Sequence, residues 1–113
     1  MINKKNAESY KWGDNCDSWI FVDNDNLSIK MESMPIKTKE KLHFHSNAQQ
    51  FFFILKGTAT FYIANKVQSI SENNGILINP KTEHYIANES DKTLDFLVIS
   101  QPTTNSDRTT IEE

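Results

Sequence analysis

The stretch "KLHFHSNAQQFFFILKG" (residues 41–57) holds two histidines, two adjacent glutamines and a run of five apolar residues. Successive side chains on a β-strand point to opposite faces, so His43 and His45 share one face of a strand, with Cα atoms about 6.5–7 Å apart. If the chain then turns and returns beside this strand, Gln50 and Phe52 have the parity of that same side. The stretch therefore predicts two strands joined by a short return, with His43, His45 and Gln50 able to converge on one metal ion.

The rest of the chain repeats this β pattern. Runs rich in Ile, Val, Phe, Tyr and Thr alternate with polar residues and are broken by Asn, Asp, Gly or Pro every eight to twelve positions, which is typical of all-β sandwiches and barrels. The predicted strands are 18–23, 26–34, 41–45, 48–55, 58–64, 66–71, 75–79, 83–88 and 93–100. We expect an all-β fold, a small antiparallel β-barrel or jelly roll with little or no helix. It forms one domain over 1–113, with the barrel core at about 18–100 and polar extensions at 1–9 and 101–113.

Composition and charge argue against several classes of protein. Fifteen acidic and twelve basic residues give a net charge of −3 without a basic stripe, so nucleic acid is not an expected partner. The longest apolar run, Phe51 to Leu55, is far shorter than the roughly 20 residues that span a bilayer, and the N-terminus lacks the apolar region of a signal peptide. We expect a soluble, cytoplasmic protein with no membrane partner. Cys16, the single cysteine, cannot form an internal disulfide, and we interpret it as a small hydrophobic residue or a bystander.

The third histidine, His84, lies 39 residues beyond His45. Pro80 marks a turn just before the strand that His84 opens, because proline cannot donate a ladder hydrogen bond. Strands that are distant in sequence face a common interior in a barrel, so His84 can complete a site with His43 and His45. A single histidine on a strand is more often an ordinary surface or core residue than a ligand, but one site here accounts for every histidine in the chain.

These residues resemble the two motifs of the cupins, a family of small antiparallel β-barrels. The first motif reads H-x-H, three or four residues, E, six residues, G. It is matched by His43, His45, Gln50 and Gly57, with Gln where the common pattern has Glu. The second motif ends in H-x-x-x-N, which is matched by His84 and Asn88.

The start of the second motif departs from the family pattern. The first Gly of the motif falls on Asn73, its Pro on Asn79 and its inner Gly on Lys81. The resemblance nevertheless covers about 26–100, and both flanks are similar to those of short single-domain bacterial cupins.

The resemblance implies a divalent transition metal, one of Fe, Mn, Ni, Zn or Cu, held by His43, His45, Gln50 and His84. Three neutral imidazoles and a neutral amide leave the charge of the ion uncompensated, which favours an anionic molecule beside it. The same ligand spacing resembles that of small cupins that linearise unsaturated uronate monosaccharides. Those proteins also use an Asp and an Arg near the last strand, where this chain has Val98 or Ile99 and, further downstream, Arg108.

Three functions stay open at this point. One is a metal-dependent enzyme, isomerase-like or dioxygenase-like, on a small polar or anionic metabolite; another is a non-catalytic ligand-binding or regulatory barrel; the last is a structural homodimer with vestigial histidines. Phe52, Ile54 and Ile86 have the inward parity and are expected to line the pocket, so no general base is apparent. Aromatic residues on both parities of 51–53 predict a homodimer, because the outer face needs a partner.

Overall fold

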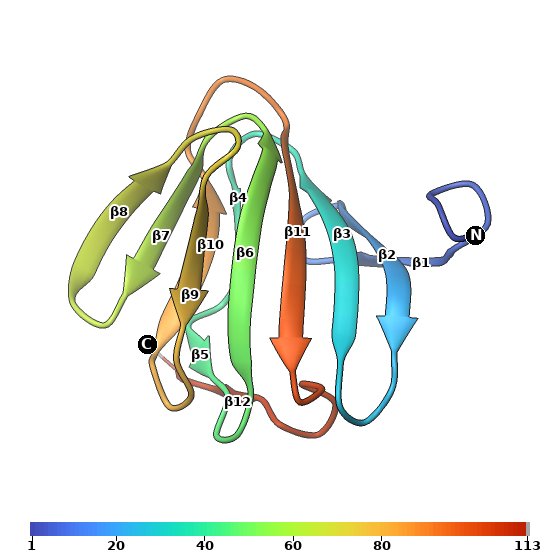
Figure 1. Ribbon diagram of the computed structural model, residues 1–113. Helices are drawn as coiled ribbons and strands as arrows, with labels where there is room; N and C mark the ends of the chain where they lie inside the picture. Colours follow the sequence, from blue (N-terminus) through green and yellow to red (C-terminus); the bar gives the residue numbers. More distant parts are fainter. Residues whose placement is uncertain (113) are drawn as a thin grey trace.

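The computed structural model describes residues 1–112. Within this range it contains strands and turns but no helix, in keeping with the alternation of apolar and polar residues along the chain. No segment in these residues could therefore cross a membrane as a helix. The strands form two sheets that face each other (Figure 1), and a hydrophobic core lies between them. Every strand pair in the described range is antiparallel. The all-β jelly-roll prediction is confirmed, with two open sheets rather than one hydrogen-bonded barrel.

The first sheet has the order β1-β2-β3-β11-β6-β9, with β1 at Glu8–Trp12, β2 at Cys16–Asp23, β3 at Ser28–Met34, β11 at Leu94–Gln101, β6 at Gln49–Lys56 and β9 at Gly75–Ile78. The second sheet has the order β12-β5-β10-β7-β8, with β12 at Thr109–Thr110, β5 at His43–Phe44, β10 at His84–Asn88, β7 at Ala59–Ile63 and β8 at Lys66–Ile70. A short strand, β4 at Thr38–Lys39, also pairs with β10.

Each predicted strand is present with shifted ends, and three strands were not predicted. These are β1, β4 and β12. The polar segment 101–113 was expected to extend from the core. Within the described residues, Thr109 and Thr110 instead form β12, which pairs with β5 in the second sheet.

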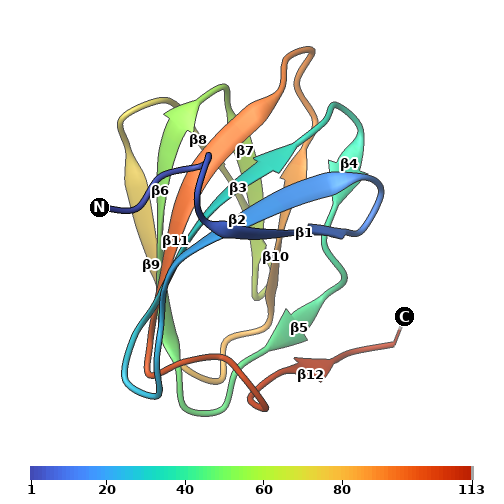
Figure 2. The same ribbon diagram turned by 90° about the vertical axis from the view of Figure 1, so that its right-hand side faces the viewer.

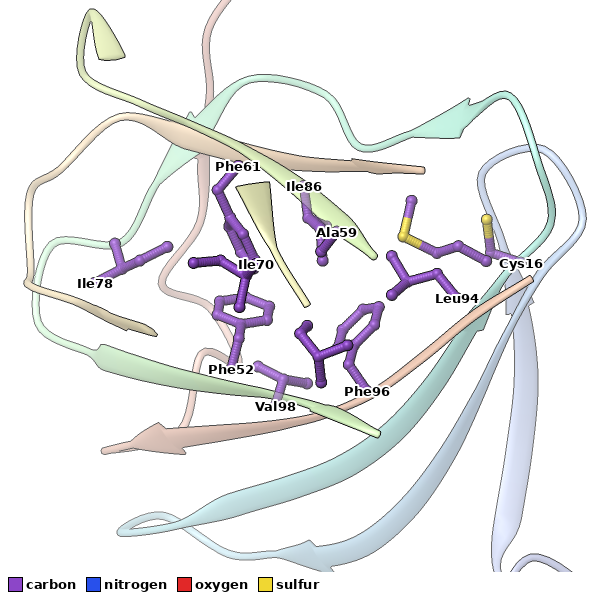
Figure 3. Close-up of a cluster of buried hydrophobic side chains, with 12 residues drawn as sticks. Cys16, Phe52, Ala59, Phe61, Ile70, Ile78, Ile86, Leu94, Phe96 and Val98 are labelled. Atoms are coloured by element: carbon purple, nitrogen blue, oxygen red, sulfur yellow. The ribbon is translucent and has the colours of Figure 1, made fainter. Parts of the chain in front are cut away.

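Aromatic side chains from both sheets form the centre of the core. Phe52 of β6 packs edge-on against Phe61 of β7, with ring centroids 5.1 Å apart, and Phe96 of β11 lies 5.7 Å from Phe52. Figure 3 shows these rings among aliphatic side chains from β9, β10 and β11. Burying each such side chain stabilises the fold by about 1.5–3 kcal/mol, so these rings help to hold the two sheets together.

Most of the side chains that β3 presents on the inner face of the first sheet are polar. Ser28, Lys30 and Glu32 of β3 lie beside the inward-facing residues of β11, with Ser28 opposite Ser100 and Lys30 opposite Val98. Ile29 and Met31 of β3 have the opposite parity and point outward, whereas Met34, at the far end of the strand, is buried in the hydrophobic core. One end of the space between the sheets is therefore polar, and the site lies there.

Two turns adopt backbone conformations that usually select glycine. Asn73 has φ 63° and Lys81 has φ 67°, both in the left-handed region that L-residues other than Asn, Asp and Gly seldom adopt. The Asn73 N–H donates to the Ile54 carbonyl at 2.8 Å, and the Lys81 N–H donates to the His45 carbonyl at 2.7 Å. Asn73 and Lys81, where the family pattern has glycine, therefore adopt a backbone conformation that favours glycine.

Asn88, the last residue of the second motif, has a structural role. It is fully buried, and its Nδ2 donates to the carbonyls of Met34 at 2.9 Å and Lys92 at 2.8 Å. Its Oδ1 accepts hydrogen bonds from the N–H and the hydroxyl of Ser90. Asn88 therefore joins the end of β3 in one sheet to the end of β10 in the other.

Candidate metal centre

The three histidines come together at the polar end of the sandwich. His43 lies in β5 directly opposite His84, the first residue of β10, and His45 follows β5 by one position. Their ring centroids are 4.4–5.6 Å apart, and one ring nitrogen from each lies within 4.8 Å of the others. The three side chains are buried. This group could hold one metal ion.

The hydrogen bonds of the rings set their tautomers. Each Nδ1 lies against a backbone carbonyl oxygen: His43 on Lys41 at 2.7 Å, His45 on Asp107 at 2.6 Å and His84 on Thr82 at 2.7 Å. A carbonyl oxygen can only accept, so the proton of each neutral ring is on Nδ1 and the lone pair is on Nε2. This is the arrangement that orients a metal-binding imidazole.

Burial keeps these imidazoles neutral. It lowers the pKa of His43 to about 3 and that of His84 to about 4, and it also lowers the pKa of His45. The charge of Arg108 acts in the same direction on each ring. The Nε2 atom of His45 is buried and has no hydrogen-bond partner within residues 1–112. A buried polar atom without a partner is costly, and a cation would satisfy it, so the histidine group fits a metal ion.

Gln50 reaches the histidines from the other sheet. Its amide nitrogen donates to the hydroxyl of Ser100 at 3.1 Å, and its Oε1 lies 3.2 Å from Nε2 of His84. Because Nε2 of His84 carries a lone pair, two acceptor atoms face each other here. A cation between them makes such a contact favourable. The amide oxygen of Gln50 therefore lies on the side of β6 that faces the histidines, which is the side that strand parity predicted.

A cavity of about 480 Å³ opens beside this group. His43, His45, Gln50 and Phe52 form part of its wall, together with charged residues from several strands and loops: Asp14, Lys30, Glu32, Lys39, Glu40, Lys41 and Arg108. The wall is much more strongly charged than was expected from the apolar residues with inward parity.

Glu40 is a buried carboxyl group of the cavity wall that inspection of the sequence missed. Its backbone N–H donates to the Ile86 carbonyl at 3.0 Å, and its Oε1 accepts the Ile86 N–H at 3.1 Å. Only 12% of its side chain is exposed, and Nη1 of Arg108 lies 3.9 Å from its Oε2. Burial raises the pKa of Glu40 to about 7, although Arg108 acts to lower it. A carboxyl group that titrates near neutral pH is suited to proton transfer.

Glu32 is a second carboxyl group in the cavity wall. Burial also raises its pKa. The sequence did contain a signal for it, because Ile29 and Met31 occupy the opposite parity of β3. No general base was apparent from the sequence, whereas the structure places two carboxyl groups, Glu32 and Glu40, in the cavity wall.

Comparison with known proteins assigns the fold to a family. Residues 30–100 match the family model of the cupin domain. The chain belongs to the cupin family. The uncharacterized protein MJ1618 of Methanocaldococcus jannaschii is 30% identical to this cupin over 86 residues, which are 76% of this chain and 69% of that protein.

Two solved structures have the same fold as this cupin. A cupin-superfamily protein of Silicibacter pomeroyi, described as a sugar phosphate isomerase, superposes with a TM-score of 0.81 at 14% identity, covering 91% of this chain and 76% of that one. An RmlC-like cupin of Shewanella frigidimarina superposes with a TM-score of 0.83 at 10% identity, covering 94% and 93% of the two chains. At these identities the likeness is one of fold.

The predicted pocket wall of this cupin needs one correction. Phe52 lines the cavity, whereas Ile54 and Ile86 are 0% and 1% exposed and belong to the hydrophobic core. All three have inward parity, but parity defines only the face of a sheet. It does not say how far along the sandwich a side chain lies from the cavity.

Proposed function

We propose that this cupin holds one divalent transition metal ion, Fe, Mn, Ni, Zn or Cu, through His43, His45, His84 and Gln50. The observation that carries the proposal is the convergence of imidazoles whose Nδ1 atoms all face carbonyl oxygens, with the buried Nε2 of His45 lacking a partner in residues 1–112. Imidazole nitrogen suits all of these ions. When bound, the ion would supply Lewis acidity to an oxygen atom of a molecule in the cavity.

The molecule in the cavity is a small polar or anionic metabolite. The cavity volume of about 480 Å³ is in the usual range for small-molecule sites, roughly 300–1,000 Å³. Arg108 and three lysines line it, and a guanidinium group is suited to bind a carboxylate or a phosphate with two hydrogen bonds. The neutral side chains around the proposed ion also leave its charge for an anion to balance.

Isomerase-like chemistry is the favoured form of this activity. Glu40 can take a proton from carbon or oxygen at one position of a bound molecule and return it at another, because its pKa is raised to about 7. Arg108 lies beside Glu40 and can hold an anionic group there. A protein with the same fold, from Silicibacter pomeroyi, is described as a sugar phosphate isomerase, so isomerase chemistry is compatible with this fold.

Anion binding provides a direct test. We expect the Zn²⁺-loaded protein to bind small hydroxycarboxylates or sugar phosphates, and Arg108→Gln to weaken that binding about 10- to 100-fold, the range of one charged hydrogen bond. Isothermal titration over a panel of such anions measures the effect. Lys66→Gln, at an exposed position of β8, is the matched control.

The same titrations separate the enzyme from the alternative function. Binding of an anion that is recovered unchanged after incubation with each metal would favour the non-catalytic, ligand-binding barrel. If no anion binds, or if both variants weaken binding equally, the proposed site is wrong.

We also propose that this cupin is a homodimer formed through the outer face of the first sheet. Apolar residues from five neighbouring strands form two rows there: Trp19, Met31, Leu97 and Phe53 in one, and Ile29, Ile99, Phe51 and Leu77 in the other. Phe51 is 37% exposed and Leu77 is 52% exposed. A continuous apolar face of this kind usually marks an interface, and a second copy of the chain brings the same face to cover it.

The mass in solution tests the dimer. We expect the wild type at micromolar concentration to have twice the chain mass by sedimentation or light scattering, and Phe51→Glu combined with Leu77→Glu to shift it to the monomer. Val67→Glu, at a 64% exposed apolar residue of the second sheet, should leave the dimer intact. A monomeric wild type would overturn this proposal.

A further inference from the structure

Residues 103–112 lie against the candidate metal centre. We call residues 103–112 the C-terminal latch; Figure 2 shows it running from β11 beneath the sandwich to β12, beside β5. The Thr103 N–H donates to the Asp25 carbonyl at 3.2 Å, which attaches the start of the latch to the turn between β2 and β3. The Ile111 N–H donates to the Leu42 carbonyl at 2.9 Å, which attaches its end beside β5.

Asp107 attaches the C-terminal latch to His45 and to the turn after it through several hydrogen bonds. Its Oδ1 accepts the Ser46 N–H at 2.7 Å, and its Oδ2 accepts the N–H groups of Asn47 and Ala48, each at 3.0 Å. Its own carbonyl oxygen lies 2.6 Å from Nδ1 of His45. Burial acts to raise the pKa of Asp107, but the three N–H groups outweigh it and lower the pKa. One residue thus holds both the turn after His45 and the ring of His45.

His45 needs this support because the sheet does not provide it. β5 ends at Phe44, so His45 lies at the start of the return to β6. The orientation of an imidazole ligand depends on the acceptor of its second nitrogen, and for His45 this acceptor belongs to the C-terminal latch. The next residue, Arg108, enters the cavity wall, and Thr110 then pairs with His43.

We propose that the C-terminal latch helps to form the metal centre, with Asp107 as the positioning residue for His45. Docking of the latch and binding of the metal then favour each other. The inference rests on the proposed metal site. Arg108, Thr109 and Thr110 are exposed, and a segment held by a few exposed hydrogen bonds opens at low free energy. Because coupling is reciprocal, a metal that selects the oriented His45 ring must also favour the docked latch.

Zn²⁺ titration against a competing chelator tests the coupling from one side. We expect Asp107→Ala to weaken Zn²⁺ binding 10- to 100-fold, the usual effect of removing a residue that orients a ligand, and Asp107→Asn to lie between it and the wild type. The control is Asp91→Ala, which changes an exposed aspartate in the turn between β10 and β11 and should alter the affinity less than twofold. Equal Zn²⁺ affinity for Asp107→Ala and the wild type would overturn the inference while leaving the metal site in place.

Amide hydrogen exchange tests it from the other side. In the wild type, Zn²⁺ should slow exchange at the Ser46, Asn47, Ala48 and Ile111 N–H groups, and in His84→Ala, which removes a ligand without touching the latch, Zn²⁺ should have no such effect. Without any metal, Asp107→Ala should exchange faster than the wild type at Ser46 to Ala48. If the wild type binds no Zn²⁺, the proposed function fails; if it binds Zn²⁺ but exchange at these groups does not slow, only the coupling fails.

Discussion

Replacing His45 by alanine is expected to remove bound metal from the protein. The Nε2 atom of His45 is buried without a partner in residues 1–112, and its loss leaves two imidazoles in place of three. Mutation of groups that merely orient a ligand lowers metal affinity by about 10- to 100-fold, so loss of the ligand itself should lower it by more than about 100-fold. The measurement is elemental analysis of protein purified without chelator or affinity metal, followed by Zn²⁺ titration.

The control for His45→Ala is Asn47→Ala. The Asn47 side chain is exposed two positions further along, and its backbone N–H, which donates to Asp107, is unchanged by the substitution. We expect close to one equivalent of metal per chain in the wild type and in Asn47→Ala. Equal metal content in the wild type and in His45→Ala would end the metal hypothesis.

Replacing Glu40 by glutamine is expected to change how stability depends on pH. In the folded protein the pKa of Glu40 is raised from 4.5 to about 7, so the folded state binds the proton more tightly than the unfolded state. This contribution to stability is fully present below pH 4.5 and is lost as the pH rises through about 7. Each pKa unit corresponds to about 1.4 kcal/mol, so the stability lost by the wild type is on the order of 3 kcal/mol.

Other groups titrate in the same range, so the quantity to measure is the difference between wild type and Glu40→Gln. The lowered pKa values of His43 and His84 act in the opposite sense, stabilising the fold as the pH rises toward 6.5. Glu32 and Arg108 act on Glu40 itself, the first raising and the second lowering its pKa. These groups remain in both proteins, and the glutamine retains an oxygen for the Ile86 N–H.

Urea unfolding at several pH values between 4.5 and 8 measures this difference. The stability of Glu40→Gln relative to wild type should rise by on the order of 3 kcal/mol across the range. Glu83→Gln, at an exposed carboxylate in the turn before β10, should run parallel to the wild type. A Glu40→Gln profile that also runs parallel to the wild type would show that Glu40 has an ordinary pKa and would remove it as the proton carrier.

Much of the fold could be predicted because alternation is a local property. Runs such as 48–55 and 93–100 contain enough alternating residues to define both a strand and its two faces. Parity within the strand was also enough to put Gln50 on the side of the histidines. In contrast, β4 and β12 contain two residues each, too few for any pattern to exist.

The residues that were missed are held by contacts between distant parts of the chain. Asp107 contacts a turn about sixty residues away, and its polar neighbours suggested a free extension. Glu40 follows β4 and is fixed by hydrogen bonds to Ile86, far along the chain. Nothing in the spacing of these residues indicates such pairings, because they depend on how the sheets are assembled.

The motif departures at Asn73 and Lys81 illustrate the same limit. Both residues adopt left-handed backbone conformations, with φ 63° and 67°, although neither is a glycine. Comparison of residue identities counts these positions as mismatches. The structure shows that both residues adopt the left-handed backbone conformation that usually selects glycine.

The four candidate ligands come from both sheets, which affects how the two sheets are held together. His43 and His84 belong to the second sheet and His45 follows it, whereas Gln50 belongs to the first. The two sheets share no ladder hydrogen bonds in the described range, so the core and a few side chains such as Asn88 hold them together. A cation shared by these four groups would act as a removable crosslink between the sheets, and its affinity would add directly to the resistance of the whole sandwich to unfolding.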